Sequence, residues 1–89
     1  MTDAQKIRAF IRKRAAKDKR RKVPAIQAKT KLFGNVLDSF GVLELIAFVE
    51  ETFDIPLKRS EVKPANFDTL EKITAFVAAR KKRARRKRV

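Results

Sequence analysis

The stretch that decides the fold lies in the middle of the chain, where residues 38–53 read DSFGVLELIAFVEETF. At the 100° per residue of an α-helix, its apolar residues gather on one side of the helix axis. That side consists of Val42, Leu45, Ile46, Val49 and Phe53. Asp38 or Ser39 can cap the N-terminus, and Pro56 closes the helical region. The pattern predicts a helix over residues 39–53 that buries this side in a core.

A second helix is predicted at the start of the chain. Thr2 and Gln5 have the spacing of a capping box, and the apolar residues that follow recur at helical intervals. These residues are Ile7, Phe10 and Ile11. We therefore expect a helix over about residues 3–17, followed by a long connection over residues 18–37. Apolar residues along the connection could pin it to the core; they are Val23, Ile26, Leu32, Phe33, Val36 and Leu37.

Two shorter patterns follow residue 56. Ser60 can cap a single helical turn, predicted over about residues 60–63 and ended by a proline. Asp68 is placed to cap the last helix, with Glu71 at the capping-box position. The apolar side of that helix consists of Leu70, Ile73, Phe76 and Val77. We expect it to cover about residues 69–80.

Length and composition agree with one small helical domain. The chain has 89 residues, of which 44% are apolar, and it has only two glycines and three prolines. Alternating β-type stretches are absent, so the predicted fold class is all-α. We expect an up-and-down bundle of three main helices plus one short helix over residues 1–79. Residues 80–89 would form a basic tail that is disordered or a frayed helix.

Charge is distributed very unevenly along the chain. The formal net charge is +14, and residues 12–22 and 80–89 hold eight basic residues each. Residues 34–57 contain no lysine or arginine and hold half of all the acidic residues. These acidic residues are Asp38, Glu44, Glu50, Glu51 and Asp54. An acidic segment therefore lies between two basic arms.

Several classes of function are excluded or disfavoured. The chain has no cysteine and no histidine, which excludes a thiol nucleophile, a disulfide, a zinc finger and a His-based triad. We expect a chain that is not an enzyme, because its carboxylates have no paired base and it has no glycine-rich phosphate loop. No apolar run approaches the ~20 residues of a membrane span, and the N-terminus lacks a signal-peptide layout. A soluble cytoplasmic protein is the expectation.

Residues 32–45, LFGNVLDSFGVLEL, resemble the modification site of the acyl carrier protein superfamily. The family signature is Asp-Ser-Leu followed by Glu-Leu at a set distance, and here it reads Asp38-Ser39-Phe40, then Glu44-Leu45. The resemblance extends through residues 50–55 and 64–69 and covers roughly residues 30–78. In its later part the chain is more similar to aminoacyl and D-alanyl-type carriers than to those of fatty acid synthesis.

The resemblance implies a carrier that holds an acyl or aminoacyl thioester. Ser39 would carry covalent 4′-phosphopantetheine, and Asp38 would support its attachment by helping to place the metal and coenzyme A of a phosphopantetheinyl transferase. The other implied partners are an acyl- or amino acid-activating ligase and an acyltransferase. A helix N-terminus also favours a phosphodiester electrostatically. Gly41 in the first turn costs roughly 1 kcal/mol relative to alanine, which the arm or its enzyme would explain by approaching closely.

The outer side of the central helix is predicted to recognise partner enzymes. Its residues are part apolar and part acidic, and they include the Phe40 that stands in place of the commoner leucine. The predicted recognition residues are Phe40, Leu43, Glu44, Ala47, Glu50 and Glu51.

Three alternatives remain open from the sequence. Ser39 could simply be a helix cap. The chain could also be a carrier that has lost its arm and serves only as an interaction module. The basic arms, residues 12–22 and 80–89, depart from the usually acidic family, and they could bind an acidic partner, an anionic membrane or nucleic acid. A small nucleic-acid-binding protein is therefore the rival hypothesis, although the phenylalanines do not alternate with the basic runs to form a stacking platform.

Overall fold

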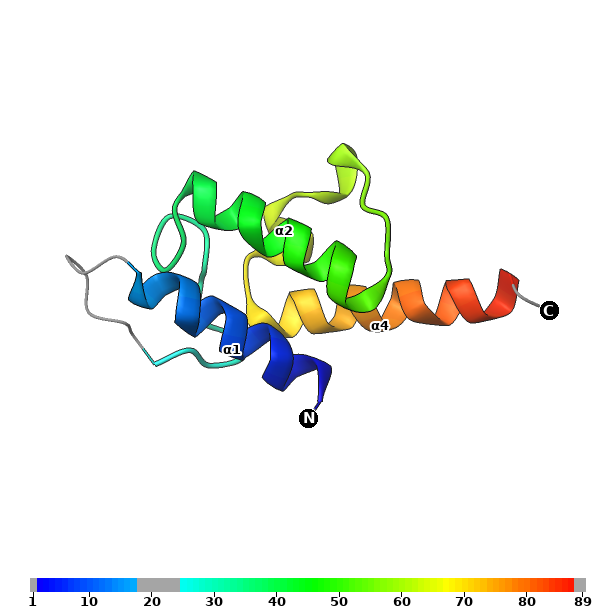
Figure 1. The fold of residues 1–89 in the computed structure, drawn as a ribbon, viewed down its shortest axis with the longest axis horizontal. Coiled ribbons are helices and arrows are strands. Elements are labelled where there is room, and N and C mark those ends of the chain that lie inside the picture. Colours follow the sequence, from blue (N-terminus) through cyan, green and yellow to red (C-terminus); the bar gives the residue numbers. More distant parts are fainter. Residues whose placement is uncertain (1, 18–24, 88–89) are drawn as a thin grey trace.

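The computed structural model describes residues 2–17 and 25–87, and side chains up to Lys82. Its elements are the helices α1 (Asp3–Ala16), α2 (Ser39–Phe53), α3 (Pro64–Phe67) and α4 (Leu70–Lys87), with a 3₁₀ turn η1 (Arg59–Glu61) before α3 (Figure 1). The described residues form no β-strand. The predicted all-α class is thus confirmed, and three long helices dominate the fold.

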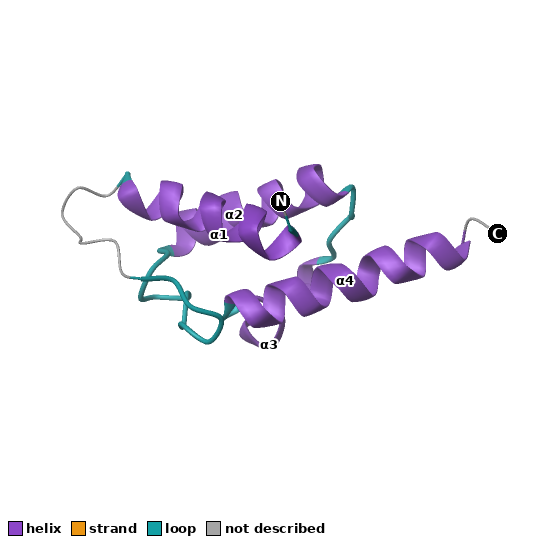
Figure 2. Cartoon of the chain, turned by 90° about the horizontal axis from the view of Figure 1, so that it is seen from below, coloured by secondary structure: helices purple, strands orange, loops and turns teal. Residues whose placement is uncertain are grey.

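The three long helices pack around one another in pairs. α1 and α2 lie side by side and run in opposite directions, while α4 lies across both and extends past them (Figures 1 and 2). α2 and α4 run in the same sense, so the expected up-and-down order is not followed strictly. The reason is that α3 is a single turn, too short to serve as a return helix.

The core lies where these helices meet. Its fully buried side chains come from all three long helices, from α3 and from the connection before α2, and each contributes about 1.5–3 kcal/mol through burial. They include Ile7, Ile11, Leu45, Val49, Phe67, Ile73 and Val77. On α2 the predicted apolar side is confirmed at Leu45 and Val49, whereas Val42, Ile46 and Phe53 are half-buried at its edges.

The connection before α2 is pinned to the start of α4. The Leu32 N–H donates to the Asp68 carbonyl at 2.7 Å, and the Glu71 N–H donates to the Ala28 carbonyl at 3.0 Å. Four of the predicted anchors are buried, namely Ile26, Leu32, Val36 and Leu37, and Phe33 is half-buried against them. Val23, also named as an anchor, lies outside the described residues. These bonds fix the position from which α2 begins.

The predicted cap of α4 was wrong by one residue. Thr69 accepts a hydrogen bond from the Lys72 N–H through its hydroxyl oxygen, and α4 begins at Leu70. Asp68 instead ends α3, and its carboxylate accepts from the Phe33 N–H at 3.2 Å. A long-range contact thus uses the carboxylate that local spacing had assigned to capping. By contrast, the capping box of Thr2 and Gln5 on α1 is confirmed.

The short helix expected over residues 60–63 is replaced by two elements. Ser60 lies inside η1, so it does not cap it. The residue before η1 is Lys58, whose N–H donates to the Glu61 carboxylate at 2.9 Å. Pro64 then begins α3 and does not merely end the preceding turn. Proline is favoured at the first helical position because its missing N–H has no intrahelical partner there.

α4 continues as a regular helix through Lys87, beyond the predicted end at residue 80. In its middle section Arg80 forms an ion pair with Glu61, and Lys81 forms one with Asp3. Alanine, lysine and arginine are also good helix formers. Of the two alternatives predicted for residues 80–89, a helical continuation is observed as far as Lys87 and a disordered tail is not. Residues 88–89 lie outside the described part.

Candidate functional site

Ser39 is the first residue of α2 and is exposed at the tip of the helix. Asp38 precedes it with an extended backbone, and the Asp38 carboxylate accepts a hydrogen bond from the Gly41 N–H at 2.6 Å. The Ser39 hydroxyl makes no hydrogen bond within residues 2–17 and 25–87. Since Asp38 caps the helix, the alternative in which Ser39 is the cap is wrong.

Gly41 is buried against the segment that leads into α2. A Cβ atom at this position would lie 3.2 Å from Asp38 Oδ1 and 3.3 Å from Leu37 Cδ2. The absence of a side chain therefore lets Leu37 and the capping carboxylate come close to the helix. The close approach that the sequence predicted at Gly41 is thus made by the chain's own residues, and it needs no arm or enzyme to explain it.

Arg14 of α1 connects the first basic run to the start of α2. Its Nε atom lies 3.0 Å from a Glu44 carboxylate oxygen, and one terminal nitrogen lies 3.5 Å from Asp38 Oδ1. The side chain is only 16% exposed, and its Nε–H is not aligned with an acceptor, so the approach to Glu44 is an ion pair without hydrogen-bond geometry. Arg14 thus holds α1 against the acidic N-terminal half of α2.

Sequence reasoning did not single out Arg14. It was treated as one of eight charges in residues 12–22, although a usable signal was present. Arg14 is seven residues after Ile7 and three after Ile11, so it lies on the buried side of α1. A charged residue in register with a core stripe predicts a partner of opposite charge.

The outer side of α2 carries the two large apolar side chains that are exposed in the described structure. Phe40 is 64% and Leu43 is 63% exposed, and Ala47 is exposed one turn beyond Leu43. Together with Ser39 they form one continuous surface at the N-terminal half of α2. We call Phe40, Leu43 and Ala47 the apolar strip. Exposed apolar side chains of this size next to each other are typical of an interaction surface.

The three glutamates predicted to recognise partners differ in their surroundings. Glu51 is exposed, and within the described residues it makes no ion pair. Glu44 is 34% exposed and is held by Arg14. Glu50 is half-buried, and its carboxylate accepts from the Leu57 N–H at 3.2 Å, which ties the end of α2 to the following loop. Of the three, Glu51 is therefore the carboxylate that is free to meet a partner.

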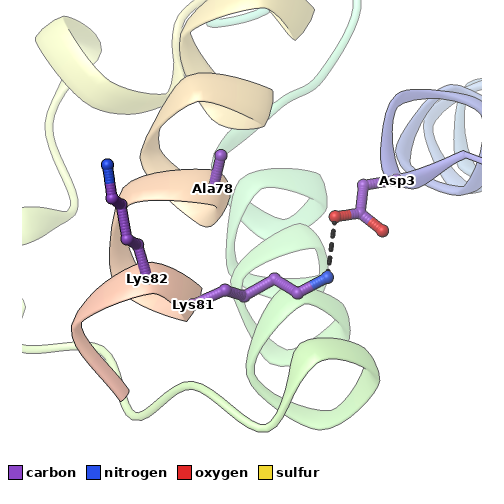
Figure 3. A pocket seen from close by; sticks show the side chains of 4 residues that line it. All are labelled: Asp3, Ala78, Lys81 and Lys82. Atoms are coloured by element: carbon purple, nitrogen blue, oxygen red, sulfur yellow. Dashed lines mark hydrogen bonds and ion pairs between the residues drawn. The ribbon is translucent and has the colours of Figure 1, made fainter. Parts of the chain in front are cut away.

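The second basic arm is partly used within the fold. Arg80 donates to the Glu61 carboxylate and to the Pro56 carbonyl, and it also lies over the Phe76 ring. Lys81 pairs with Asp3 of α1 at 3.0 Å across a hollow that Ala78 and Lys82 also line (Figure 3). These contacts link α4 to η1 and to the start of α1. The predicted role of residues 80–89 in binding a partner therefore cannot include Arg80 and Lys81 without breaking these pairs.

The Glu61 carboxylate has a lowered pKa as a result of these contacts. The hydrogen bond from the Lys58 N–H contributes most, followed by the hydrogen bond from Arg80, and both stabilise the ionised form. Partial burial acts in the opposite direction but is outweighed. Glu61 therefore links η1 to α4 as a charged group.

Nothing in the described part of the chain points to a metal centre or a membrane span. No group of three or more acidic side chains lies close enough together to hold a metal ion. None of the helices, over the residues described, combines the length and apolar character that crossing a bilayer needs. No protein-family model, curated protein or solved structure matches the chain.

Proposed function

We propose that the protein is a carrier that holds an acyl or aminoacyl group as a thioester on 4′-phosphopantetheine attached to Ser39. One observation carries the proposal: the Ser39 hydroxyl is exposed at a helix tip and is not needed for capping, because Asp38 performs that role. A serine in this position can be modified without loss of the cap. Its position beside the apolar strip further supports a residue that partner enzymes reach.

The N-terminus of α2 has the donors that a phosphodiester on Ser39 would need. The first N–H groups of a helix have no intrahelical acceptor, and Asp38 occupies only that of Gly41. The N–H groups of Ser39 and Phe40 therefore remain for an anion, and the helix dipole favours negative charge at this end. These residues fit the group, although the nearby Asp38 carboxylate opposes a second negative charge.

The attachment would be made by a separate phosphopantetheinyl transferase. The Ser39 oxygen would form a bond to the phosphorus that bears the pantetheine of coenzyme A, lose its proton, and release adenosine 3′,5′-bisphosphate. Asp38 would help to place the donor and its metal within that enzyme. The bound group would supply a terminal thiol, which this cysteine-free chain lacks, for thioester formation.

Partner enzymes would dock on the apolar strip. Phe40, Leu43 and Ala47 provide apolar contact close to Ser39, and Glu51 provides a free negative charge toward the far end of α2. Glu44 and Glu50 are already engaged within the fold and would contribute less. The partners would be an acyl- or amino acid-activating ligase and an acyltransferase, with an aminoacyl or short acyl group as cargo.

The test uses the full chain, coenzyme A and a phosphopantetheinyl transferase of broad specificity. Intact mass spectrometry should show the addition of one phosphopantetheine. The chain contains only two serines, so Ser60→Ala is a matched control for Ser39→Ala. Modification should be lost with Ser39→Ala and kept with Ser60→Ala. Absence of modification in the unchanged chain, or its persistence in Ser39→Ala, would contradict the proposal.

A further inference from the structure

A groove separate from Ser39 runs between α1 and α2. Its main part has a volume of about 340 Å³ and is lined by Lys6, Ala9, Phe10, Lys13, Phe48 and Thr52. A smaller hollow of about 180 Å³ continues it toward the C-terminus of α1 and shares Phe10 and Lys13. The smaller hollow is also lined by Arg14, Lys17 and Glu44. The two hollows form one elongated depression along the pair of helices.

The floor of the groove is apolar. The Phe10 and Phe48 rings stack on each other, with centroids 4.5 Å apart and an interplanar angle of 17°. Both side chains are half-buried against the core. The stacked rings join α1 to α2 and supply the aromatic part of the lining between the two helices.

One rim of the groove is positively charged. Lys6, Lys13 and Lys17 fall within about 40° of one another around α1, at 100° per residue, and they span about 16 Å along its axis. All three are exposed, and none makes an ion pair with the rest of the described chain. They differ in this from Arg14 and Lys81, whose charges are paired internally. The rim is therefore a row of free positive charge beside an apolar floor.

We propose that this groove binds an acidic amphipathic helix of a partner protein. The apolar side chains of such a helix, spaced three and four residues apart, would lie over Phe10 and Phe48, and its carboxylates would meet the three lysines. Lys6 and Lys13 are two helical turns apart, and Lys13 and Lys17 are one turn apart. Carboxylates spaced by one or two turns along the partner helix would therefore match them. This inference is independent of the modification of Ser39.

The same features argue against other anionic partners. Single-stranded nucleic acid binds proteins by stacking bases on aromatic faces, and here the stacking of Phe10 on Phe48 already covers one face of each ring. An anionic membrane is bound by apolar side chains that project into it beside basic residues. In the described part of the chain the large apolar side chains that project, Phe40 and Leu43, lie on the acidic helix α2 and outside the groove lining. An apolar floor with one basic rim fits an amphipathic acidic helix best.

The test measures binding of a designed peptide to the full chain. The probe is a labelled peptide of about 18 residues with leucines along one helical stripe and glutamates on both sides of it. A scrambled peptide of the same composition controls for net charge. Fluorescence anisotropy gives the affinity, and amide shifts in NMR spectra locate the site.

Two pairs of variants separate groove binding from diffuse electrostatic attraction. The first variant reverses the charge of the rim by the triple substitution Lys6→Glu, Lys13→Glu and Lys17→Glu. Its control is the triple variant Arg8→Glu, Arg12→Glu and Lys29→Glu. These control residues are exposed outside the groove, and the control changes the net charge by the same amount. Filling the groove with Ala9→Trp is compared with Ala16→Trp on the same helix, where the alanine is also exposed but does not line the groove. Circular dichroism checks that each variant is folded.

We expect the rim reversal and Ala9→Trp each to weaken peptide binding by about tenfold or more, and the two controls to change it less than about threefold. Shifted amides should cluster on α1 and α2 along the groove. The proposal is overturned by no binding up to about 1 mM, by equal binding of the scrambled peptide, or by equal losses in rim and control variants. Polyuridine RNA and phosphatidylglycerol vesicles are tested in the same way. The proposal is also overturned if either of them binds more tightly than the peptide and if its binding is lost with the groove variants but not with the controls.

Discussion

The Oδ1 atom of Asp38 lies 2.6 Å from the backbone nitrogen of Gly41, so the residue before Ser39 caps α2, and the Ser39 hydroxyl has no hydrogen bond among the described residues. This relationship separates two roles that neighbouring polar residues at a helix start usually share. Asp38 stabilises the helix, and Ser39 is free for chemistry. Stability and modification should therefore respond to different substitutions.

We expect Asp38→Ala to lower the free energy of unfolding by about 1 kcal/mol, because it removes the cap. Asp38→Asn should lower it much less, since an amide oxygen can still accept from the Gly41 N–H. Ser39→Ala should stay within about 0.5 kcal/mol of the unchanged protein. Urea denaturation followed by circular dichroism measures all three. A loss with Ser39→Ala as large as that with Asp38→Ala would show that the serine also has a capping role.

Gly41→Ala should fail to stabilise α2, although alanine is the better helix former. Helix propensity alone predicts a gain of about 1 kcal/mol. The new Cβ would instead be 3.2 Å from Asp38 Oδ1 and 3.3 Å from Leu37 Cδ2, which would push the cap away. Ala47→Gly, at an exposed position of the same helix, is the reference and should cost about 1 kcal/mol. A full gain with Gly41→Ala in thermal denaturation would mean that Leu37 and Asp38 move aside easily.

The sequence was sufficient to predict the bounds of α1 and α2 because each has a local signal. The apolar period and the Asp38 cap define α2, whose observed range Ser39–Phe53 coincides with the predicted one. The Thr2 and Gln5 capping box defines α1, which ends at Ala16, one residue before the predicted end. Local patterns of this kind depend on neighbours three or four residues away, and these are visible in the sequence.

The errors in the predicted fold come from interactions between distant residues. Asp68 was assigned to a cap, but its carboxylate bonds to Phe33, 35 residues earlier. Arg80 and Lys81 were assigned to a free tail, but they pair with Glu61 and Asp3. A run of like charges gives no sign of which members have partners. Arg14 differs, because its register with Ile7 and Ile11 indicates a partner, but only the packing of α1 on α2 identifies that partner as Glu44.

Arg14 and Glu44 should show measurable coupling in a double-mutant cycle. Arg14→Gln, Glu44→Gln and the double variant are compared by urea denaturation in low salt. We expect a coupling free energy of up to about 1 kcal/mol that falls as salt is added, because the pair is partly exposed. Lys13→Gln replaces a neighbouring cation that has no ion pair among the described residues, and it should show no coupling to Glu44→Gln. If Lys13→Gln shows the same coupling free energy to Glu44→Gln, the coupling comes from the net charge of α1 and not from a specific Arg14–Glu44 pair.

The apolar strip should affect partner enzymes more than it affects folding. Leu43→Ser and Phe40→Ser replace exposed side chains, so the free energy of unfolding should change by less than about 0.5 kcal/mol. If the carrier proposal holds, KM for the protein in the transferase reaction should rise severalfold while kcat changes little, since docking contacts form before the chemical step. Lys31→Ser, at an exposed position outside α2, is the control. An unchanged KM with both strip variants would show that the transferase does not dock on the apolar strip.

The contacts of Glu61 predict a specific loss of stability in acid. Hydrogen bonds from the Lys58 N–H and from Arg80 hold the pKa of the Glu61 carboxyl below its usual value of 4.5. Because the folded protein has the lower pKa, the stabilisation is complete above pH 4.5 and disappears as the pH falls through the folded pKa. Glu61→Gln should therefore lower Tm at neutral pH, and its difference from the unchanged protein should shrink as the pH falls below 4.5. Glu51→Gln removes the same charge without these contacts and controls for net charge. A Tm difference for Glu61→Gln that stays constant down to the lowest pH would show that the ionised carboxylate does not hold η1 to α4.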